Sequence, residues 1–305
     1  MRIVFLGTSE FAGQVLVGIA DQYRPVLVIT RPDRASGRGR RLASPPLATT
    51  AHSLGIEPCQ PQSVNDPDTL ELIDASKPDV VVVCAFGALI KEPLLSAHLM
   101  LNVHPSLLPR WRGAAPIERA IMAGDQQSGV SIMRVTAGLD SGPVCLAASE
   151  SIGPLDSYGS LAPRLSALGA ELLVDALRAL DKGQELDFAD QDEGKATYAE
   201  KIAAGDRVLG CERSASELER VVRALQPHIG ARVALPDGTM LGVQQARIVQ
   251  DSPPFDGAAR TGVFASAGRL LLGCSEGVLE LLRVQPAGKR TMEAAAFLRG
   301  RELSG

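Results

Sequence analysis

Apolar runs separated by segments of helical periodicity fill the first half of the chain. Residues 3–6 form a short apolar run, residues 10–20 have the spacing of an amphipathic helix, and residues 25–30 form a second apolar run rich in β-branched side chains. The unbroken hydrophobicity of residues 80–83 is typical of a strand covered on both faces. Further apolar runs alternate with helical segments at residues 79–86, 99–104, 130–135 and 144–148. The pattern predicts an α/β fold with a doubly wound, mostly parallel sheet.

The second half of the chain has a different texture. Helical spacing at residues 161–180 is followed by a polar, acidic stretch, and Ser214 with Glu217 has the capping-box spacing that starts another helix. Beyond Pro227, short β-type segments alternate with Asp-Gly, Ala-Gly and Glu-Gly turns, which predicts a small, OB-like β-barrel. We therefore expect an N-terminal domain, a linker and a C-terminal β-barrel domain at residues 1–183, 184–205 and 206–305.

Composition removes several alternatives. The 305 residues suffice for two domains, and 45% hydrophobic with 22% charged residues is typical of a folded protein rather than a disordered one. The longest apolar stretch, residues 80–90, is too short for a membrane span of roughly 20 residues, and the first apolar run is too short for the hydrophobic region of a signal peptide, so we expect none. We therefore expect a cytoplasmic protein without membrane contact.

The cysteines, histidines and glycines indicate no bound metal and no dinucleotide. The five cysteines include no Cys-x-x-Cys pair and the four histidines are scattered, so we expect reduced structural thiols and no metal site. Gly7 and Gly13 are the outer glycines of a dinucleotide-binding fingerprint, but its central glycine is missing and Thr30 with Arg31 replaces the acidic residue that binds ribose. We expect no NAD, and interpret both glycines as sites of a tight turn and close helix packing.

Charge is concentrated in one place. The net charge of −4 argues against a generally basic surface for nucleic acid. Residues 31–42 nevertheless hold five arginines and one aspartate. A glycine-rich loop of this composition is commonly a solvated one, and the alternative is a site for an anionic partner.

Polar side chains of catalytic type occur at the end of one predicted strand. Asn102 and His104 lie two positions apart, so on an extended strand they share a face, and Pro105 then turns the chain. In open α/β sheets ligands bind at the carboxyl ends of the strands. An Asn-x-His pair that only ties down a loop is an equally common alternative.

A carboxylate on a glycine-flanked loop extends this group. Asp140 stands between Gly138 and Gly142, where an isolated Asp is more often a turn residue than a catalytic one. With Asn102 and His104 it forms an Asn, His and Asp set without a Gly-x-Ser-x-Gly or Cys-His nucleophile motif. The set therefore predicts acyl transfer between two bound substrates without a covalent enzyme intermediate.

Several segments of the chain resemble the methionyl-tRNA formyltransferase family. The motif Asn-x-His-x-Ser-Leu-Leu-Pro at residues 102–109 is shared by the wider class of formyl-tetrahydrofolate transferases, and the continuation at residues 110–117 is characteristic of the tRNA-directed members. The resemblance extends over nearly the whole chain and includes the segments at residues 31–42, 129–133, 138–142 and 285–290. Two segments depart from the family pattern, at residues 205–210 and 226–230.

The resemblance implies transfer of the formyl group of 10-formyltetrahydrofolate to the methionine amino group of initiator methionyl-tRNA, by direct acyl transfer through a tetrahedral intermediate. It places this chemistry in a formyltransferase-type, Rossmann-like domain. Asn102 and His104 would stabilise the developing oxyanion, and Asp140 would orient His104 and help to move the proton. A folate-binding segment would consist of Ser106, Leu107, Leu108 and Pro109.

The resemblance also implies a tRNA partner and the basic residues that bind it. The arginine loop would order on the acceptor end of the tRNA, and the C-terminal barrel would add contacts. We expect a monomer. The tRNA-binding residues would be Arg34, Arg38, Arg40, Arg41, Lys289 and Arg290.

Three alternative functions differ in the features that they need. A formyltransferase acting on a sugar-nucleotide amine would share the Asn, His and Asp set but would need no basic loop at residues 31–42. A purine-pathway formyltransferase would leave the C-terminal barrel without a role. A non-catalytic RNA-binding protein would use the barrel and leave the Asn, His and Asp set unexplained.

Overall fold

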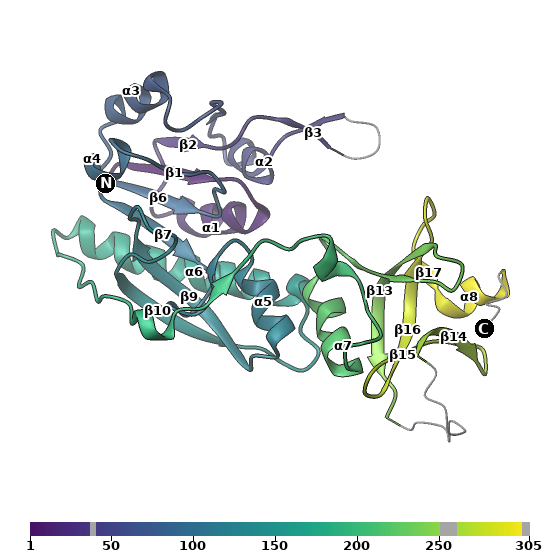
Figure 1. Ribbon diagram of the computed structural model, residues 1–305. Helices are drawn as coiled ribbons and strands as arrows, with labels where there is room; N and C mark the ends of the chain where they lie inside the picture. The colour runs from purple at the N-terminus through teal and green to yellow at the C-terminus, as the bar shows by residue number, and fades with distance from the viewer. Residues whose placement is uncertain (37–40, 251–260, 301–305) are drawn as a thin grey trace. The chain divides into compact units, whose positions relative to one another are not determined.

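A sheet of seven strands organises the first part of the chain (Figure 1), within the residues 1–36, 41–250 and 261–300 that the computed structural model describes. The strands β5, β2, β1, β6 and β7 are parallel to one another, β9 runs antiparallel to β7 near one edge, and β10 runs antiparallel to β9. This arrangement confirms the predicted doubly wound, mostly parallel sheet. In spatial order the strands are β10 (Val144–Ser151), β9 (Gln127–Arg134), β7 (Met100–His104), β6 (Val80–Cys84), β1 (Ile3–Gly7), β2 (Leu27–Ile29) and β5 (Pro58–Cys59).

Helices cover both faces of this sheet, because its central strands are apolar on both sides. Helix α6 packs so closely on one face that a Cβ atom at Gly169 would lie 2.9 Å from Val103 of β7 and 3.8 Å from Val15 of α1. On the opposite face, Ile73 of α3 and Leu94 of α4 join a buried cluster with alternate residues of β1 and β6. Among the described residues, no helix is both long enough and apolar enough to span a membrane. The helices are α1 (Glu10–Ala20), α2 (Pro46–Ser53), α3 (Pro67–Ala75), α4 (Leu94–Ala97) and α6 (Tyr158–Asp181).

The two glycines after the first strand are required by close packing. A Cβ atom at Gly7 would lie 2.8 Å from the Cβ of Ala12 and 2.9 Å from the carbonyl oxygen of Cys84, and one at Gly13 would lie 2.7 Å from Thr50 Oγ1. Such distances are shorter than van der Waals contact. The interpretation of Gly7 and Gly13 as packing positions is therefore confirmed.

The arginine-rich segment is a hairpin at its base. Strands β3 (Arg34–Ser36) and β4 (Arg41–Ala43) pair antiparallel, with Arg34 opposite Ala43. Arg34 is exposed. The predicted tRNA-binding residues Arg38 and Arg40 lie outside the described residues, and of Arg41 only the backbone is described.

A curled antiparallel sheet forms the second part of the chain. Its strand order is β12-β13-β16-β15-β14 with β17 on β16, and register shifts between Val243 and Ala246 bend β13. Within the described residues the two end strands do not pair with each other, so the predicted small barrel takes the form of a half-barrel. The elements are α7 (Ala215–Ala224), β12 (Ala231–Ala234), β13 (Met240–Ile248), β14 (Gly262–Ser266), β15 (Arg269–Gly273), β16 (Val278–Gln285), β17 (Met292–Glu293) and α8 (Ala294–Arg299).

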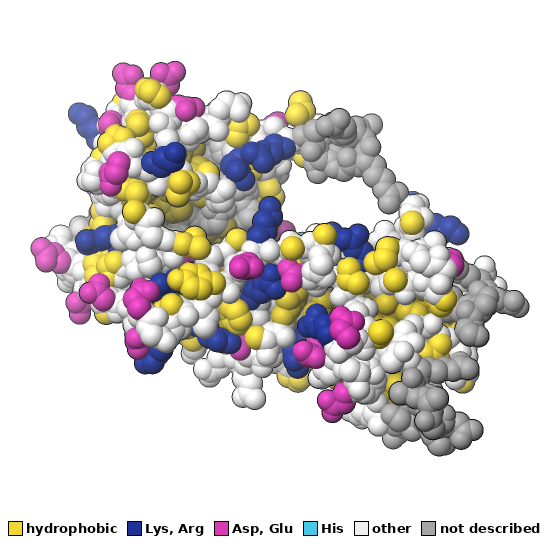
Figure 2. Space-filling view, viewed as in Figure 1, with side chains coloured by type: hydrophobic (Ala, Val, Ile, Leu, Met, Phe, Trp, Pro, Cys, Tyr) yellow, Lys and Arg dark blue, Asp and Glu magenta, His cyan; other side chains and the backbone are white. Residues whose placement is uncertain are grey.

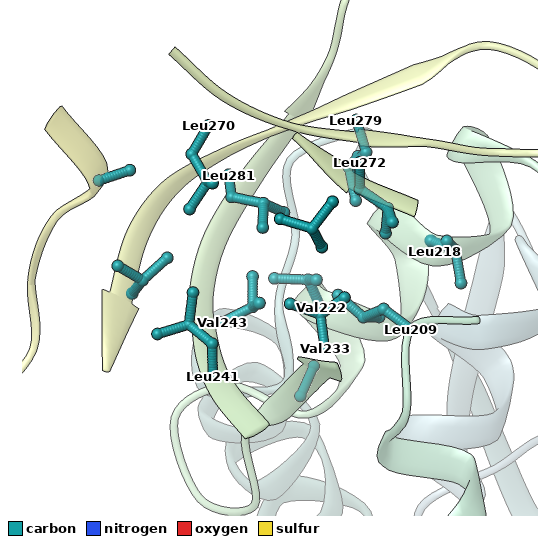
Figure 3. Packing of buried hydrophobic residues seen from close by; sticks show 14 of the residues in the cluster. Leu209, Leu218, Val222, Val233, Leu241, Val243, Leu270, Leu272, Leu279 and Leu281 are labelled. Atoms are coloured by element: carbon teal, nitrogen blue, oxygen red, sulfur yellow. The ribbon is translucent and has the colours of Figure 1, made fainter. Parts of the chain in front are cut away.

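The half-barrel closes its core with a helix. Leu218 and Val222 of α7 point into a cluster with Val243 and Leu281 of the sheet (Figure 3). The expected capping box starts this helix, since the Ser214 hydroxyl accepts from the Glu217 amide and the Glu217 carboxylate accepts from the Ser214 amide. Helix and sheet thus bury one continuous apolar core.

The chain divides into two compact units, and it crosses between them several times. The first unit comprises Met1–Pro116, Gln127–Ser151 and Ala162–Glu200. The second comprises Ile117–Gln126, which holds most of α5 (Pro116–Ala123), together with Ile152–Leu161 and Lys201–Gly305. Residues 184–200 of the expected linker thus belong to the first unit. The division of the chain into domains at residues 183 and 205 stays a prediction.

Both segments that depart from the family pattern make contacts inside the second unit. His228 stacks on Tyr158 with ring centroids 3.7 Å apart, and its Nε2 lies 2.9 Å from Glu118 of α5. Asp206 accepts two hydrogen bonds from Arg119, also of α5, at 3.2 and 2.9 Å. These contacts therefore tie α5 and the start of α6 to the segments at residues 205–210 and 226–230.

Candidate active site

Two of the predicted catalytic residues lie at the carboxyl end of β7. Asn102 pairs with Val83 of β6 on one side and Met133 of β9 on the other, and His104 is the last residue of the strand. The His104 side chain is only 5% exposed, whereas Asn102 is half-buried. The two side chains therefore share a face at the end of a strand whose position is fixed on both sides.

The loop after β9 brings Asp140 to the same place. Asp140 Oδ1 accepts a long hydrogen bond of 3.4 Å from Asn102 Nδ2, and Asp140 Oδ2 lies 3.6 Å from His104 Nδ1. Oδ2 also accepts a 2.8 Å hydrogen bond from the backbone amide of Gly113. We call Asn102, His104 and Asp140 the polar triad.

A backbone carbonyl fixes the state of the imidazole. His104 Nε2 lies 2.9 Å from the carbonyl oxygen of Trp111, and because a carbonyl only accepts, Nε2 carries a proton. The other nitrogen, Nδ1, then faces the Asp140 carboxylate. A proton arriving at Nδ1 would point directly at that carboxylate.

One residue of the triad and one residue that contacts it have left-handed backbone conformations. The φ angles of Asp140 and Trp111 are 45° and 62°. Residues other than glycine adopt such angles at a cost, and they cluster at functional sites where surrounding contacts hold them. Gly142 permits the turn, because a Cβ atom there would overlap the carbonyl oxygen of Arg134.

A segment that the sequence assigns to a linker forms part of the site. We call residues 187–200 the strap. Strand β11 (Tyr198–Ala199) of the strap pairs in parallel with β8 (Arg112–Gly113), and Thr197 Oγ1 accepts a 2.9 Å hydrogen bond from the Trp111 amide. Gln191 donates to the carbonyls of Asp140 and Gly142 at 2.9 and 2.7 Å.

Sequence reasoning missed the strap because nothing in it is periodic. Its contacts depend on single side chains and on a pairing of two residues, which leave no hydrophobic pattern. The available signal was Arg112 in the motif at residues 110–117, since an arginine that becomes buried needs a carboxylate elsewhere in the chain.

Arg112 is that buried arginine. Its side chain is 2% exposed, and its two terminal nitrogens donate to the two oxygens of Glu193 at 2.9 and 2.7 Å. These hydrogen bonds lower the pKa of the Glu193 carboxyl and raise the pKa of Arg112. The Nε atom of Arg112 donates to Gln191 Oε1 at 3.0 Å, so the arginine is paired on every side of its guanidinium.

The predicted folate-binding segment continues from the triad. Ser106 is buried, and its hydroxyl donates to the Arg110 carbonyl at 2.6 Å, so this side chain holds the turn together. Ser131 Oγ bridges the Ser106 carbonyl and the Leu108 amide at 2.8 and 3.1 Å. Leu107, Leu108 and Pro109 are half-buried.

The predicted tRNA-binding residues lie in both units. Arg34 belongs to the first unit, whereas Lys289 and Arg290 are exposed in the turn between β16 and β17 of the second. On the face shown in Figure 2, basic side chains are interspersed with acidic ones. Exposure of these three residues leaves them accessible to an anionic partner.

Family models match both parts of the chain. The model described as formyl transferase matches residues 1–177, and the model of the formyl transferase C-terminal domain matches residues 201–302. Among solved structures, HypX from Aquifex aeolicus in complex with tetrahydrofolic acid aligns with a TM-score of 0.66 at 17% identity, over 98% of this chain and 47% of that one. A Helicobacter canadensis N-formyltransferase in complex with folinic acid and dTDP-3-aminofucose aligns with a TM-score of 0.64 at 14% identity, over 92% and 98%. At these identities the structures share the fold.

Curated relatives are similar over the full length. The methionyl-tRNA formyltransferase of Methylococcus capsulatus is 42% identical over 308 residues, covering 100% of this chain and 98% of that protein. The protein of the same name from Halorhodospira halophila is 41% identical over 99% of this chain and 97% of its own length. The chain therefore belongs to the methionyl-tRNA formyltransferase family.

Proposed function

We propose that this enzyme formylates the methionine amino group of initiator methionyl-tRNA with 10-formyltetrahydrofolate as the donor, and that the polar triad carries out the transfer. The observation that carries the proposal is the meeting of Asn102, His104 and Asp140 within 3.6 Å at the carboxyl end of β7, in a chain that is similar over its full length to methionyl-tRNA formyltransferases. We further propose that the enzyme is a monomer, which sedimentation analysis would test.

The reaction needs a hydrogen-bond donor that stabilises the oxyanion and a group that carries the proton from the amine to folate N10. The neutral amine attacks the formyl carbon, a new C–N bond forms, and the carbonyl π pair moves to oxygen. The tetrahedral species then collapses, the bond to folate N10 breaks with its electron pair, and the proton lost by the amine passes to N10. The overall reaction therefore consumes and releases no net proton.

The triad supplies what these steps require. Asn102 Nδ2 makes only one hydrogen bond to a described residue, at 3.4 Å, so its second hydrogen can bind the developing oxyanion. His104 carries a proton on Nε2, so its Nδ1 faces the Asp140 carboxylate. Asp140 accepts a hydrogen bond from the Gly113 amide and lies beside both Asn102 and His104. A carboxylate beside Nδ1 can accept the proton of the amine directly or through the ring.

The folate and tRNA contacts extend the proposal. Leu107, Leu108 and Pro109 would line the pterin pocket, with Ser106 and Ser131 holding their backbone in place. Arg34, Arg38, Arg40 and Arg41 would bind the acceptor end of the tRNA. Lys289 and Arg290 would contribute contacts from a C-terminal tRNA-binding domain at residues 206–305.

Incubation with labelled 10-formyltetrahydrofolate tests the function. Charged initiator tRNA and a sugar-nucleotide amine are offered separately, and label should appear on the tRNA alone. Label on the sugar nucleotide would replace the proposal with the second acceptor. Asn102→Ala, His104→Ala and Asp140→Ala should each lower turnover by about 10²- to 10³-fold in the same assay.

A further inference from the structure

We propose that Gln191 is a positioning residue, which holds the Asp140 loop in the conformation that the proposed formyl transfer requires. The inference rests on that proposed function and deepens it, because Gln191 acts through a group of the triad. Gln191 belongs to the strap, 51 residues beyond Asp140 in the chain. No periodic pattern or motif in the sequence connects the two.

The orientation of the Gln191 amide follows from its partners. Arg112 Nε can only donate, so the oxygen of Gln191 must face it, at 3.0 Å. The NH2 group then faces the carbonyls of Asp140 and Gly142, which can only accept, at 2.9 and 2.7 Å. All three hydrogen bonds are satisfied in this orientation and none in the flipped one.

The Asp140 loop needs support from outside its own residues, and we call the two hydrogen bonds that Gln191 donates to it the clamp. Asp140 has a left-handed φ of 45°, and the neighbouring Leu139 is 62% exposed, so the Leu139 side chain contributes little burial to hold this turn. Gln191 binds the backbone carbonyl of Asp140 and that of Gly142 two residues later. The clamp therefore fixes the backbone on which the carboxylate is mounted, while the Gly113 amide fixes the carboxylate itself at 2.8 Å.

The ion pair between Arg112 and Glu193 holds Gln191 in place. The Arg112 side chain is 2% exposed. Its two terminal nitrogens donate to the two carboxylate oxygens of Glu193, and its Nε donates to Gln191. Arg112 directly precedes Gly113, whose amide binds Asp140. Arg112 and Gly113 thus both support Asp140: the Gly113 amide binds its carboxylate, and Arg112 holds Gln191, which binds its backbone carbonyl.

Gln191→Ala removes the hydrogen bonds to the Asp140 loop, while all three side chains of the triad are still present. Misplacement of a reacting group by about 1 Å can cost up to roughly 100-fold in activity. We expect kcat to fall by that factor, with KM for both substrates changed by less than about threefold, because no atom of Gln191 is assigned to binding. The matched control is Gln14→Ala, which removes a hydrogen bond to Ser166 elsewhere in the first unit and should leave kcat unchanged.

A double mutant separates positioning from a general structural role. If Gln191 acts only through Asp140, then Asp140→Ala with Gln191→Ala should have the kcat of Asp140→Ala alone within about twofold, because groups that act as a unit are not additive. Multiplied losses in the double mutant would overturn the proposal, as would a Gln191→Ala enzyme with wild-type kcat.

A third variant keeps the test decisive if Gln191→Ala does not fold. Gln191→Met retains the volume without hydrogen bonds and should show the same loss of kcat with wild-type far-ultraviolet circular dichroism. A folded Gln191→Met enzyme with normal kcat would overturn the proposal. Failure of the wild-type enzyme to formylate either acceptor would instead refute the proposed function, so the two failures are distinguishable.

Discussion

The proposed catalytic role of the Asp140 carboxylate has a geometric part and an electrostatic part, and single substitutions separate them. Asp140→Asn keeps an oxygen for the Gly113 amide and the shape of the side chain, but removes the negative charge that faces His104. We expect kcat to fall by about 10²-fold or more with an unchanged Tm, because charge at the reacting centre acts on the transition state. Steady-state kinetics and a thermal melt measure both. An Asp140→Asn enzyme with near-normal kcat would assign Asp140 a purely geometric role.

Two thiols, the half-buried Cys145 and the buried Cys274, give a second prediction for single residues. Burial raises the pKa of Cys145 and of Cys274 to about 11 each. A raised pKa means that at pH 8 these groups are thiols rather than reactive thiolates. Alkylation at pH 8 followed by mass spectrometry should therefore leave both cysteines unmodified in the folded enzyme and label both in denaturant. Labelling of Cys145 in the folded enzyme at the rate of a free thiol would contradict this account.

Residues of the site differ in how far the sequence reveals them. Asn102 and His104 follow from the two-residue period of a strand and from the rule that ligands bind at strand ends. Asp140 stands in a loop, where position along the chain does not determine position in space, so residue pattern alone favoured a turn residue. Gln191 has no pattern at all, because its role depends on three hydrogen bonds to distant groups.

Helices and strands also differ in how well the sequence predicts them, because some have a periodic pattern and others do not. The strands of the first sheet and helix α7 follow from hydrophobic runs and a capping box, which are local signals. The pairing of β8 with β11 involves two residues on each strand and is fixed by the burial of Arg112. The strap is stabilised by one ion pair and a pairing of two residues, so its sequence resembles that of a linker although it packs against the site.

Helix α5 gives a prediction at the scale of elements. Two hydrogen bonds from Arg119 lower the pKa of Asp206, so this carboxylate stabilises the second unit. A lowered folded pKa gives stability that is complete above the unfolded value of about 3.9 and is lost as the pH falls through the folded value. Asp206→Asn should cost about 1 kcal/mol of unfolding free energy at pH 7, since both side chains are partly exposed.

The pH dependence of that cost provides the check. Chemical denaturation of wild type and Asp206→Asn at pH 7 and at about pH 3 should give a smaller difference at the lower pH, because the wild-type carboxyl is then partly protonated. A difference that stays constant over this range would mean that charge does not contribute to the contact. Asp175→Asn, at an exposed ion pair on α6, serves as a control with little expected effect.

At the scale of the whole molecule, two units of different architecture share one function. The first carries the triad on a parallel sheet, and the second is a half-barrel whose core is independent of it. The sequence predicts both architectures, the first from its alternating apolar runs and helical segments and the second from the short β-type segments beyond Pro227. It does not predict that α5 and the start of α6 belong to the second unit, because those contacts come from single side chains, His228 and Asp206, that leave no periodic pattern.

The proposed tRNA contacts of the arginine-rich segment at residues 31–42 would act in a protein whose net charge of −4 opposes binding of a polyanion. Replacing Arg38 and Arg40 with Ala should raise KM for the tRNA and leave KM for the folate unchanged. For every phosphate that an arginine no longer neutralises, the slope of log K against log salt should become flatter by roughly 0.7 to 0.9. Arg178→Ala, an exposed arginine of α6 paired with Asp175, is the matched control and should leave the slope unchanged. Equal losses for both substrates would show instead that the hairpin supports the fold of the catalytic unit.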